Sequence, residues 1–82
     1  MEEEIKHQLS VDGYNIDLYF PRYKLAVECD ANQTDRNIEY FVRKQKHIEK
    51  VLDCEFIRYN PHDVNFCIFE VINRIYKHIN RC

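Results

Sequence analysis

Hydrophobic and polar residues alternate along the first third of the chain, and this pattern predicts β-strands. Ile5, Leu9 and Val11 favour a first strand over residues 5–11, although their spacing also fits a short helix. Asp12-Gly13 then marks a hairpin turn. Residues 14–20 alternate throughout, which places on one face Tyr14, Ile16, Leu18 and Phe20, and on the other Asn15, Asp17 and Tyr19.

A second hairpin is predicted after residue 20. Pro21-Arg22-Tyr23 interrupts the pattern, because proline lacks the N–H that a strand ladder needs. The alternation resumes from Lys24 to Asp30, with Leu25, Val27 and Cys29 on one face and Ala26, Glu28 and Asp30 on the other. We expect this apolar strand to be central in the sheet and covered by a helix.

The rest of the chain shows helical spacing on both sides of one short strand. A helix is predicted from about Asp35, its N-cap, to Leu52, with an apolar stripe of Ile38, Phe41, Val42, Ile48 and Leu52. A strand is predicted over Glu55–Tyr59 and ends at Asn60-Pro61. A last helix over Asn65–Asn80 would bury Ile68, Ile72, Ile75 and Ile79. The order βββαβα predicts an α/β fold, with a mixed β-sheet of hairpin-connected strands and flanking helices.

Composition limits the class of protein. The 82 residues suffice for a single domain over 1–82, and a hydrophobic fraction of 45% excludes a disordered chain. The net charge of -2 does not by itself indicate a nucleic-acid partner. No stretch is apolar enough to span a membrane and the start, Met1-Glu2-Glu3-Glu4, is unlike a signal peptide. We therefore expect an intracellular protein of the nucleus or cytoplasm, not a secreted one.

Cysteine and histidine spacing argues against a zinc site. The four cysteines stand singly, at Cys29, Cys54, Cys67 and Cys82, and so do the four histidines, at His7, His47, His62 and His78. Reduced thiols are the favoured interpretation, with a disulfide framework as the alternative. His62, in a loop beyond a strand end, is a candidate base only if that end faces the hairpin, and a plain surface role is favoured.

Three carboxylates are the main candidate for chemistry. If the two hairpin strands pair about a turn near Arg22, Asp17 lies across from Ala26 to Glu28, close to Asp30. Crowded carboxylates either raise their pKa values or bind a hard divalent cation, and Mg²⁺ (or Mn²⁺) with bound water suits phosphodiester hydrolysis. The alternative is that the acidic residues form a solvated outer face of the sheet.

Several motifs together carry a resemblance to a known superfamily. They are Tyr14–Pro21 (YNIDLYFP), Leu25–Asp30 (LAVECD), Asp35-Arg36, Arg43–Lys46 (RKQK) and Phe56–Pro61 (FIRYNP). The chain resembles the restriction-endonuclease-like PD-(D/E)xK superfamily, and within it the very-short-patch-repair-type endonuclease domains in proteins of large DNA viruses and mobile elements. The resemblance implies a restriction-endonuclease-like core, Mg²⁺ binding by Asp17 and Glu28, and a nucleic-acid backbone lying across the hairpin.

The chain departs from the superfamily pattern at two places. Asp30 stands where many members have lysine, and Ala31–Thr34 replaces a Gly-His of the related repair-type domains. The basic role must then come from elsewhere. Gln45 lies on the otherwise apolar stripe of the first long helix, so we expect it either to reach the site or to hydrogen-bond the backbone, and Lys44 is a second candidate.

Basic residues offer a local surface for DNA. Arg43, Lys46 and Lys50 follow one another at i, i+3 and i+7 on the predicted helix, a spacing that could follow phosphates. The candidates for nucleic-acid binding are Arg43, Lys44, Lys46, Lys50 and Arg58, and Arg74, Lys77 and Arg81 could extend the surface. A solvated helix face, partly paired with acidic residues, is the alternative.

The sequence thus supports three hypotheses. The first is a metal-dependent endonuclease domain that hydrolyses DNA phosphodiester bonds, with Asp17, Glu28, Asp30 and Gln45 in the site. The second is a catalytically inactive nuclease-fold module for nucleic-acid or protein binding, as a piece of a larger chain. The third is self-association as a homodimer through exposed strand edges and aromatic residues such as Tyr19 and Tyr23.

Overall fold

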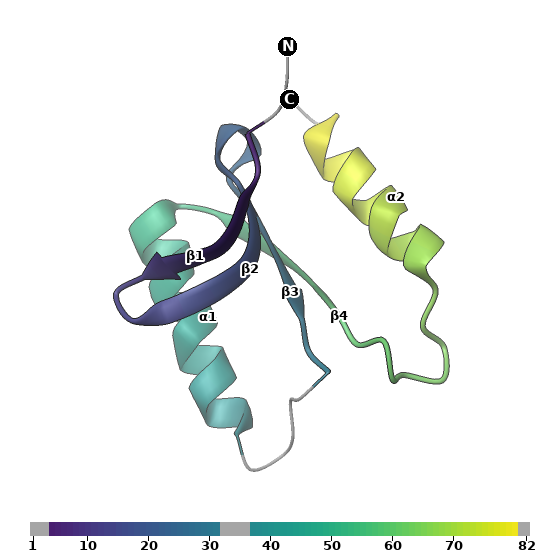
Figure 1. Cartoon of the computed structure of the whole chain (residues 1–82), viewed down its shortest axis with the longest axis horizontal. Helices are drawn as coiled ribbons and strands as arrows, with labels where there is room; N and C mark the ends of the chain where they lie inside the picture. The colour runs from purple at the N-terminus through teal and green to yellow at the C-terminus, as the bar shows by residue number, and fades with distance from the viewer. Residues whose placement is uncertain (1–3, 32–36, 81–82) are drawn as a thin grey trace.

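A computed structural model describes residues 4–31 and 37–80 of the chain, and within them the elements follow the order βββαβα. Figure 1 shows the strands lying between the two helices. The elements are β1 (Lys6–Val11), β2 (Tyr14–Phe20), a 3₁₀ turn η1 (Pro21–Tyr23), β3 (Leu25–Cys29), α1 (Ile38–Leu52), β4 (Glu55–Tyr59) and α2 (Ile68–Ile79). The predicted α/β class and element order are confirmed.

The sheet has the order β1-β2-β3-β4, with antiparallel pairs on either side of β2 and a parallel pair between β3 and β4. Both predicted hairpins form. Asp12 and Gly13 turn the first one with φ values of +50° and +87°, which is the left-handed region that glycine enters without a Cβ penalty. Lys24 ends the second turn, also in the left-handed region. Strand β3 lies in the interior of the sheet, as predicted.

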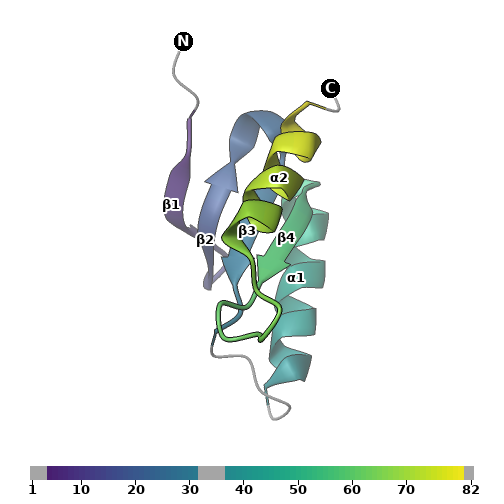
Figure 2. The ribbon, with the colours of Figure 1, turned by 90° about the vertical axis from the view of Figure 1, so that its right-hand side faces the viewer.

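The two helices cover opposite faces of the sheet, as the side view in Figure 2 illustrates. On the face of α1, Ile48 packs with Ile16 and Ala26. On the face of α2, Ile75 packs against Leu25 and Val27. Within residues 4–31 and 37–80, no helix is long and apolar enough to cross a bilayer.

Strand β2 does not keep one apolar face, which corrects the predicted alternation. Ile16 packs with the cluster under α1, but Leu18 packs with the cluster under α2. The change occurs at Asp17, opposite Gln8 of β1, where Gln8 has a φ of +52° and distorts the strand. Asp17 therefore lies at the point where the hairpin passes from one core cluster to the other.

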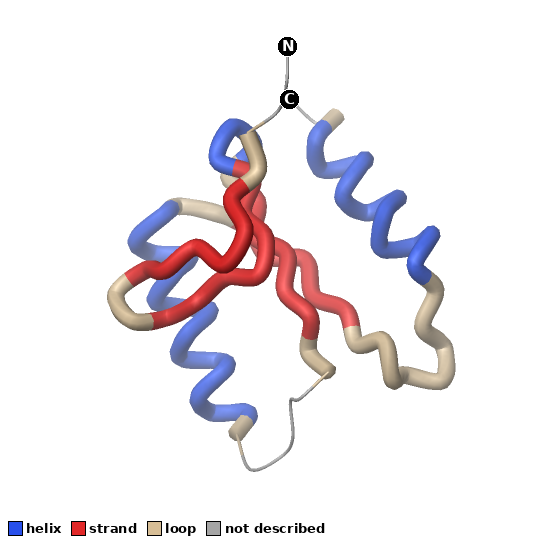
Figure 3. The backbone as a smooth tube through the Cα atoms, in the orientation of Figure 1, coloured by secondary structure: helices blue, strands red, loops and turns tan. Residues whose placement is uncertain are grey.

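Helix α2 also differs from its prediction. It begins at Ile68 rather than Asn65, after the loop over residues 60–67 that Figure 3 shows in tan. Its buried residue is Val71, whereas Ile68 and Ile72 are 45% and 54% exposed. His78 explains this rotation, because its ring nitrogens bond the Glu55 carboxylate at 2.9 Å and the carbonyl of Tyr23 at 2.9 Å. These contacts turn the 71, 75 and 78 positions toward the sheet.

Helix α1 follows its prediction in part. It ends at Leu52 as predicted, and its described part begins at Ile38, with Asn37 at the N-cap position. The N-cap predicted at Asp35 lies outside the described residues. Ile48 of the predicted stripe is fully buried, but Ile38 and Val42 are each 46% exposed. The second buried residue of the helix is Lys44, which the stripe did not include.

Candidate functional site

The pairing of β2 with β3 brings Asp17 beside Glu28. Leu18 is opposite Val27, so in this antiparallel pair Asp17, which precedes Leu18, lies opposite Glu28, which follows Val27. One carboxylate oxygen of Asp17 accepts the N–H of Cys29 at 2.9 Å, and the other accepts the side-chain amide of Gln8 at 3.2 Å. The Asp17 and Glu28 carboxyl groups are close enough for each to affect the pKa of the other. The predicted approach of these two carboxyl groups is confirmed.

Burial and hydrogen bonding push the two pKa values apart. Burial alone would raise the pKa of Asp17, but the bonds from the Cys29 amide, Glu28 and Gln8 outweigh it and lower this pKa. Burial raises the pKa of Glu28, against the opposing effect of Lys44. When the pair holds one proton, that proton therefore resides on Glu28 while Asp17 is ionised.

Lys44 of α1 completes this part of the site. Its Nζ lies 2.7 Å from Oε1 of Glu28, and the two side chains are only 9% and 5% exposed. The lysine is thus buried within the fold and does not belong to the outer basic surface. Its position could have been found from spacing, because Phe41, Lys44 and Ile48 follow at i, i+3 and i+7 along one face of the helix.

Asp30 is engaged by a second, separate chain of polar contacts. Its Oδ1 accepts Nη1 of Arg58 at 2.7 Å, and Nε of the same arginine bonds Oε1 of Gln45 at 2.5 Å. Gln45 in turn donates to Glu49 at 3.1 Å. In residues 4–31 and 37–80, the Nη2 atom of Arg58 is buried and has no hydrogen-bond partner. Gln45 therefore reaches Asp30 through Arg58, and not directly.

The potential metal ligands are distributed unequally between these two groups. Asp17 and Glu28 lie together, whereas Asp30 forms an ion pair with Arg58 in which the side chains are 14% and 22% exposed. Across the described part of the chain, no three His, Cys, Asp or Glu side chains are arranged to hold a metal ion. The structure thus brings together two of the three predicted carboxylates, Asp17 and Glu28, and pairs the third, Asp30, with Arg58.

The predicted nucleic-acid-binding residues separate into exposed and enclosed groups. Arg43, Lys46 and Lys50 are exposed on α1, where Arg43 makes a 3.9 Å contact with Glu39. Lys44 and Arg58 face inward, toward Glu28 and Asp30. The first group is open to solvent, whereas Lys44 and Arg58 form ion pairs with the carboxylates of Glu28 and Asp30.

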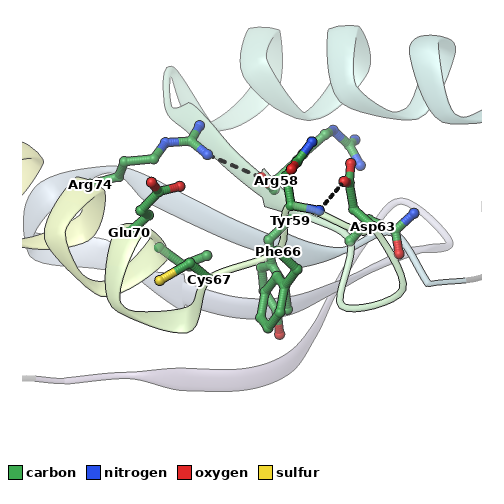
Figure 4. Close-up of a pocket in the computed structure, with 10 residues that line it drawn as sticks. Arg58, Tyr59, Asp63, Phe66, Cys67, Glu70 and Arg74 are labelled. Atoms are coloured by element: carbon green, nitrogen blue, oxygen red, sulfur yellow. Dashed lines mark hydrogen bonds between the residues drawn. The ribbon is translucent and has the colours of Figure 1, made fainter.

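A cavity of about 250 Å³ borders the site on the α2 face of the sheet. Figure 4 shows its lining, which includes Tyr59, Cys67, Glu70 and Arg74. Burial raises the pKa of Tyr59, and a hydrogen bond with Cys29 and the charge of Asp17 act in the same direction. Through Tyr59 the cavity therefore adjoins the carboxylate pair, although its lining mixes acidic, basic and aromatic groups.

Comparisons with known proteins leave the geometry as the basis for assigning a function. Searches of protein-family models, of curated proteins and of solved structures each found no match. The geometry provides an ionised carboxylate, a neighbouring carboxyl group with a raised pKa and a buried ammonium group beside it. Such a set can bind a hard cation and can stabilise negative charge that develops on a substrate.

Proposed function

We propose that this chain is a metal-dependent endonuclease domain of the PD-(D/E)xK superfamily, with a restriction-endonuclease-like core, that hydrolyses DNA phosphodiester bonds. The observation that carries the proposal is the contact of Asp17 and Glu28 beside a buried Lys44. Carboxylates on neighbouring strands with a nearby ammonium are the groups that the superfamily resemblance calls for. Here the ammonium comes from α1, since Asp30 stands at the usual lysine position.

The carboxylate pair is chemically suited to Mg²⁺ or Mn²⁺. Proteins commonly hold Mg²⁺ through one or two carboxylates and leave the remaining positions to water and substrate phosphate, so two carboxylates suffice. Hydrogen bonds lower the pKa of Asp17 and so favour its ionised form. One of its oxygens accepts a long hydrogen bond of 3.2 Å from Gln8, which a metal ion could displace. When bound, the ion supplies acidification of water and neutralisation of phosphate charge. Asp17 and Glu28 would hold it.

Lys44 and Arg58 then have distinct positioning and electrostatic roles. Lys44 lowers the pKa of Glu28 and keeps this carboxylate in place, at 2.7 Å. Its charge also favours negative charge that accumulates on the phosphate in the transition state. Arg58 fixes Asp30 and Gln45, which prevents Asp30 from repelling the phosphate. The exposed residues Arg43, Lys46 and Lys50 would follow the DNA backbone.

A catalytically inactive nuclease-fold module is the second candidate, and burial favours it. The side chains of Glu28 and Lys44 are 5% and 9% exposed, so both must become more accessible before a scissile phosphate can approach them. Without such a movement, the domain would bind nucleic acid or protein through its surface alone. The two candidates predict different outcomes in one experiment.

The test combines metal binding with DNA cleavage on the whole chain. Amide and side-chain NMR shifts are followed during a Mg²⁺ titration, and plasmid and single-stranded DNA are incubated with Mg²⁺ or Mn²⁺. We expect shifts at Asp17 and Glu28 and cleavage that is lost in Asp17→Asn. The matched control is Asp53→Asn, because the Asp53 side chain is 91% exposed.

Each result selects one candidate. Cleavage that survives Asp17→Asn would place the site elsewhere. Loss of cleavage in Asp53→Asn as well would show that the effect of Asp17→Asn is not specific to the site. Shifts at Asp17 with no cleavage on any DNA would support the inactive module. If millimolar Mg²⁺ moves neither Asp17 nor Glu28, the proposed metal chemistry is wrong.

A further inference from the structure

The open edge of β4 carries backbone groups that point away from the sheet. Strand β4 is the last in the order β1-β2-β3-β4. The N–H of Glu55 bonds the carbonyl of Lys24 at 2.9 Å, and the carbonyl of Tyr59 accepts the N–H of Asp30 at 2.7 Å. Since alternate residues of a strand direct their N–H and C=O groups to opposite sides, Phe56 and Arg58 direct theirs outward.

A basic side chain contacts this edge at the carbonyl of Arg58. Arg74 of α2 donates from Nη1 to the carbonyl of Arg58 at 3.3 Å, the contact drawn in Figure 4. Arg74 is an exposed side chain, so it can leave this carbonyl without uncovering a core. The outward groups of Phe56 and Arg58 then offer the donors and acceptors that an added strand requires.

Two grooves of different chemistry flank the same edge. The groove toward α1 has a volume of about 190 Å³, and its apolar lining comes from Ile38, Phe41 and Val42. The groove toward α2 has a volume of about 300 Å³, and its basic lining includes Arg74 and Lys77. Glu55 is the acidic residue in the lining of this groove, so the two cations, Arg74 and Lys77, leave positive charge in excess there.

We propose that the β4 edge binds an extended segment of a partner protein in which apolar and acidic side chains alternate. Side chains of an added strand point alternately to the two faces of the sheet. Apolar side chains would therefore enter the groove toward α1, and acidic ones would meet Arg74 and Lys77. The main chain of the segment pairs with Phe56 and Arg58. This interaction is separate from the proposed nuclease chemistry.

Charge argues against a second copy of the chain as the occupant. A two-fold pairing of β4 with itself would place both copies of α2 on the same face of the joined sheet. Arg74 and Lys77 of each copy would then approach their counterparts, and like charges repel. An acidic partner segment gains from the same residues instead.

The test uses a synthetic ten-residue peptide of alternating Leu and Glu, added to the isotopically labelled whole chain. We expect amide shifts and slower hydrogen exchange at Phe56 and Arg58, and at least tenfold weaker binding to Lys77→Glu. Lys6→Glu, the same change on exposed strand β1 at the opposite edge of the sheet, should bind as the unmodified chain does. Two further peptides carry N-methyl groups on alternate residues, one on the odd-numbered and the other on the even-numbered residues. Only one of these sets of N–H groups faces β4, so one of the two peptides should lose binding.

Three outcomes would overturn the proposal. The first is equal binding of a peptide of alternating Leu and Lys, which would show that charge plays no part. The second is retention of binding by both methylated peptides, which would exclude strand pairing. The third is concentration-dependent dimerisation with protection of Phe56 and Arg58 in the absence of peptide, which would identify a second copy as the occupant.

Discussion

Removal of the Lys44 ammonium group tests what the buried ion pair contributes to the fold. Lys44→Met keeps an unbranched side chain, one heavy atom shorter, but leaves Glu28, which is 5% exposed, without its 2.7 Å partner. Loss of one member of a buried pair costs about 3–5 kcal/mol. A domain of this size has a free energy of unfolding of about 4–12 kcal/mol, from ~0.05–0.15 kcal/mol per residue. The variant should therefore lose a large share of its stability.

Urea unfolding followed by circular dichroism measures this loss. A cost of about 3 kcal/mol lowers the urea midpoint by about 1–3 M, for an m-value of ~1–3 kcal/mol/M. Lys50→Met is the matched control, because Lys50 is exposed on the same helix, and it should stay within about 0.5 kcal/mol of the unmodified chain. The double variant Lys44→Met/Glu28→Met removes both charges and should recover most of the loss.

The pH dependence of unfolding gives an independent check. The pKa of Glu28 is raised in the fold, so its contribution to stability is fully present below its unfolded pKa and is lost as the pH rises through the folded pKa. Lys44→Met removes an effect that lowers the pKa of Glu28 in the fold. The pH range over which the variant loses the stability contributed by Glu28 should therefore extend to higher pH. A cost below about 1 kcal/mol, or a double variant as unstable as the summed single variants, would refute this reasoning.

Three further predictions concern the turn, a thiol and α2. The Cβ added by Gly13→Ala meets no atom within 4 Å, but alanine must adopt a φ of +87° there. The melting temperature should therefore fall by about 4–8 °C, for a cost of ~1 kcal/mol. Burial raises the pKa of Cys54 to about 11, so iodoacetamide at neutral pH should modify Cys67 but reach Cys54 only after unfolding, as mass spectrometry can show. His78→Phe should cost about 1–3 kcal/mol in urea unfolding and speed amide exchange in α2.

The predicted fold succeeded where one local signal determined an element. Residues 14–20 and 55–59 form strands with the predicted bounds, because turn signals or a break in the pattern limit each run. The face of α2 could not be predicted in this way, since Val71 and Ile72 are both apolar and the helical period allows either stripe. The choice depends on His78 reaching Glu55 and Tyr23, which are far away in the sequence.

The site was predictable to the extent that it depends on hairpin register. The turn near Arg22 fixes which residue of β3 meets Asp17, and so Glu28 followed from the pattern. Helical spacing places Lys44 on the inner face of α1, but the ion pairs of Lys44 and Arg58 with their carboxylates did not follow, because a basic residue on a helix or a strand is ordinarily exposed. Their burial depends on carboxylates that come from a different part of the chain.

The Lys44–Glu28 pair requires an explanation beyond stability. Replacing a buried ion pair with apolar side chains of similar volume is often neutral or stabilising, so the pair does not serve the free energy of folding alone. Either it selects one packing of α1 on the sheet or it serves the chemistry of the site. If Lys44→Met/Glu28→Met unfolds cooperatively with unchanged amide shifts outside the site, packing does not depend on the pair. Loss of Mg²⁺ binding and cleavage in that same well-folded variant would then assign the pair to function.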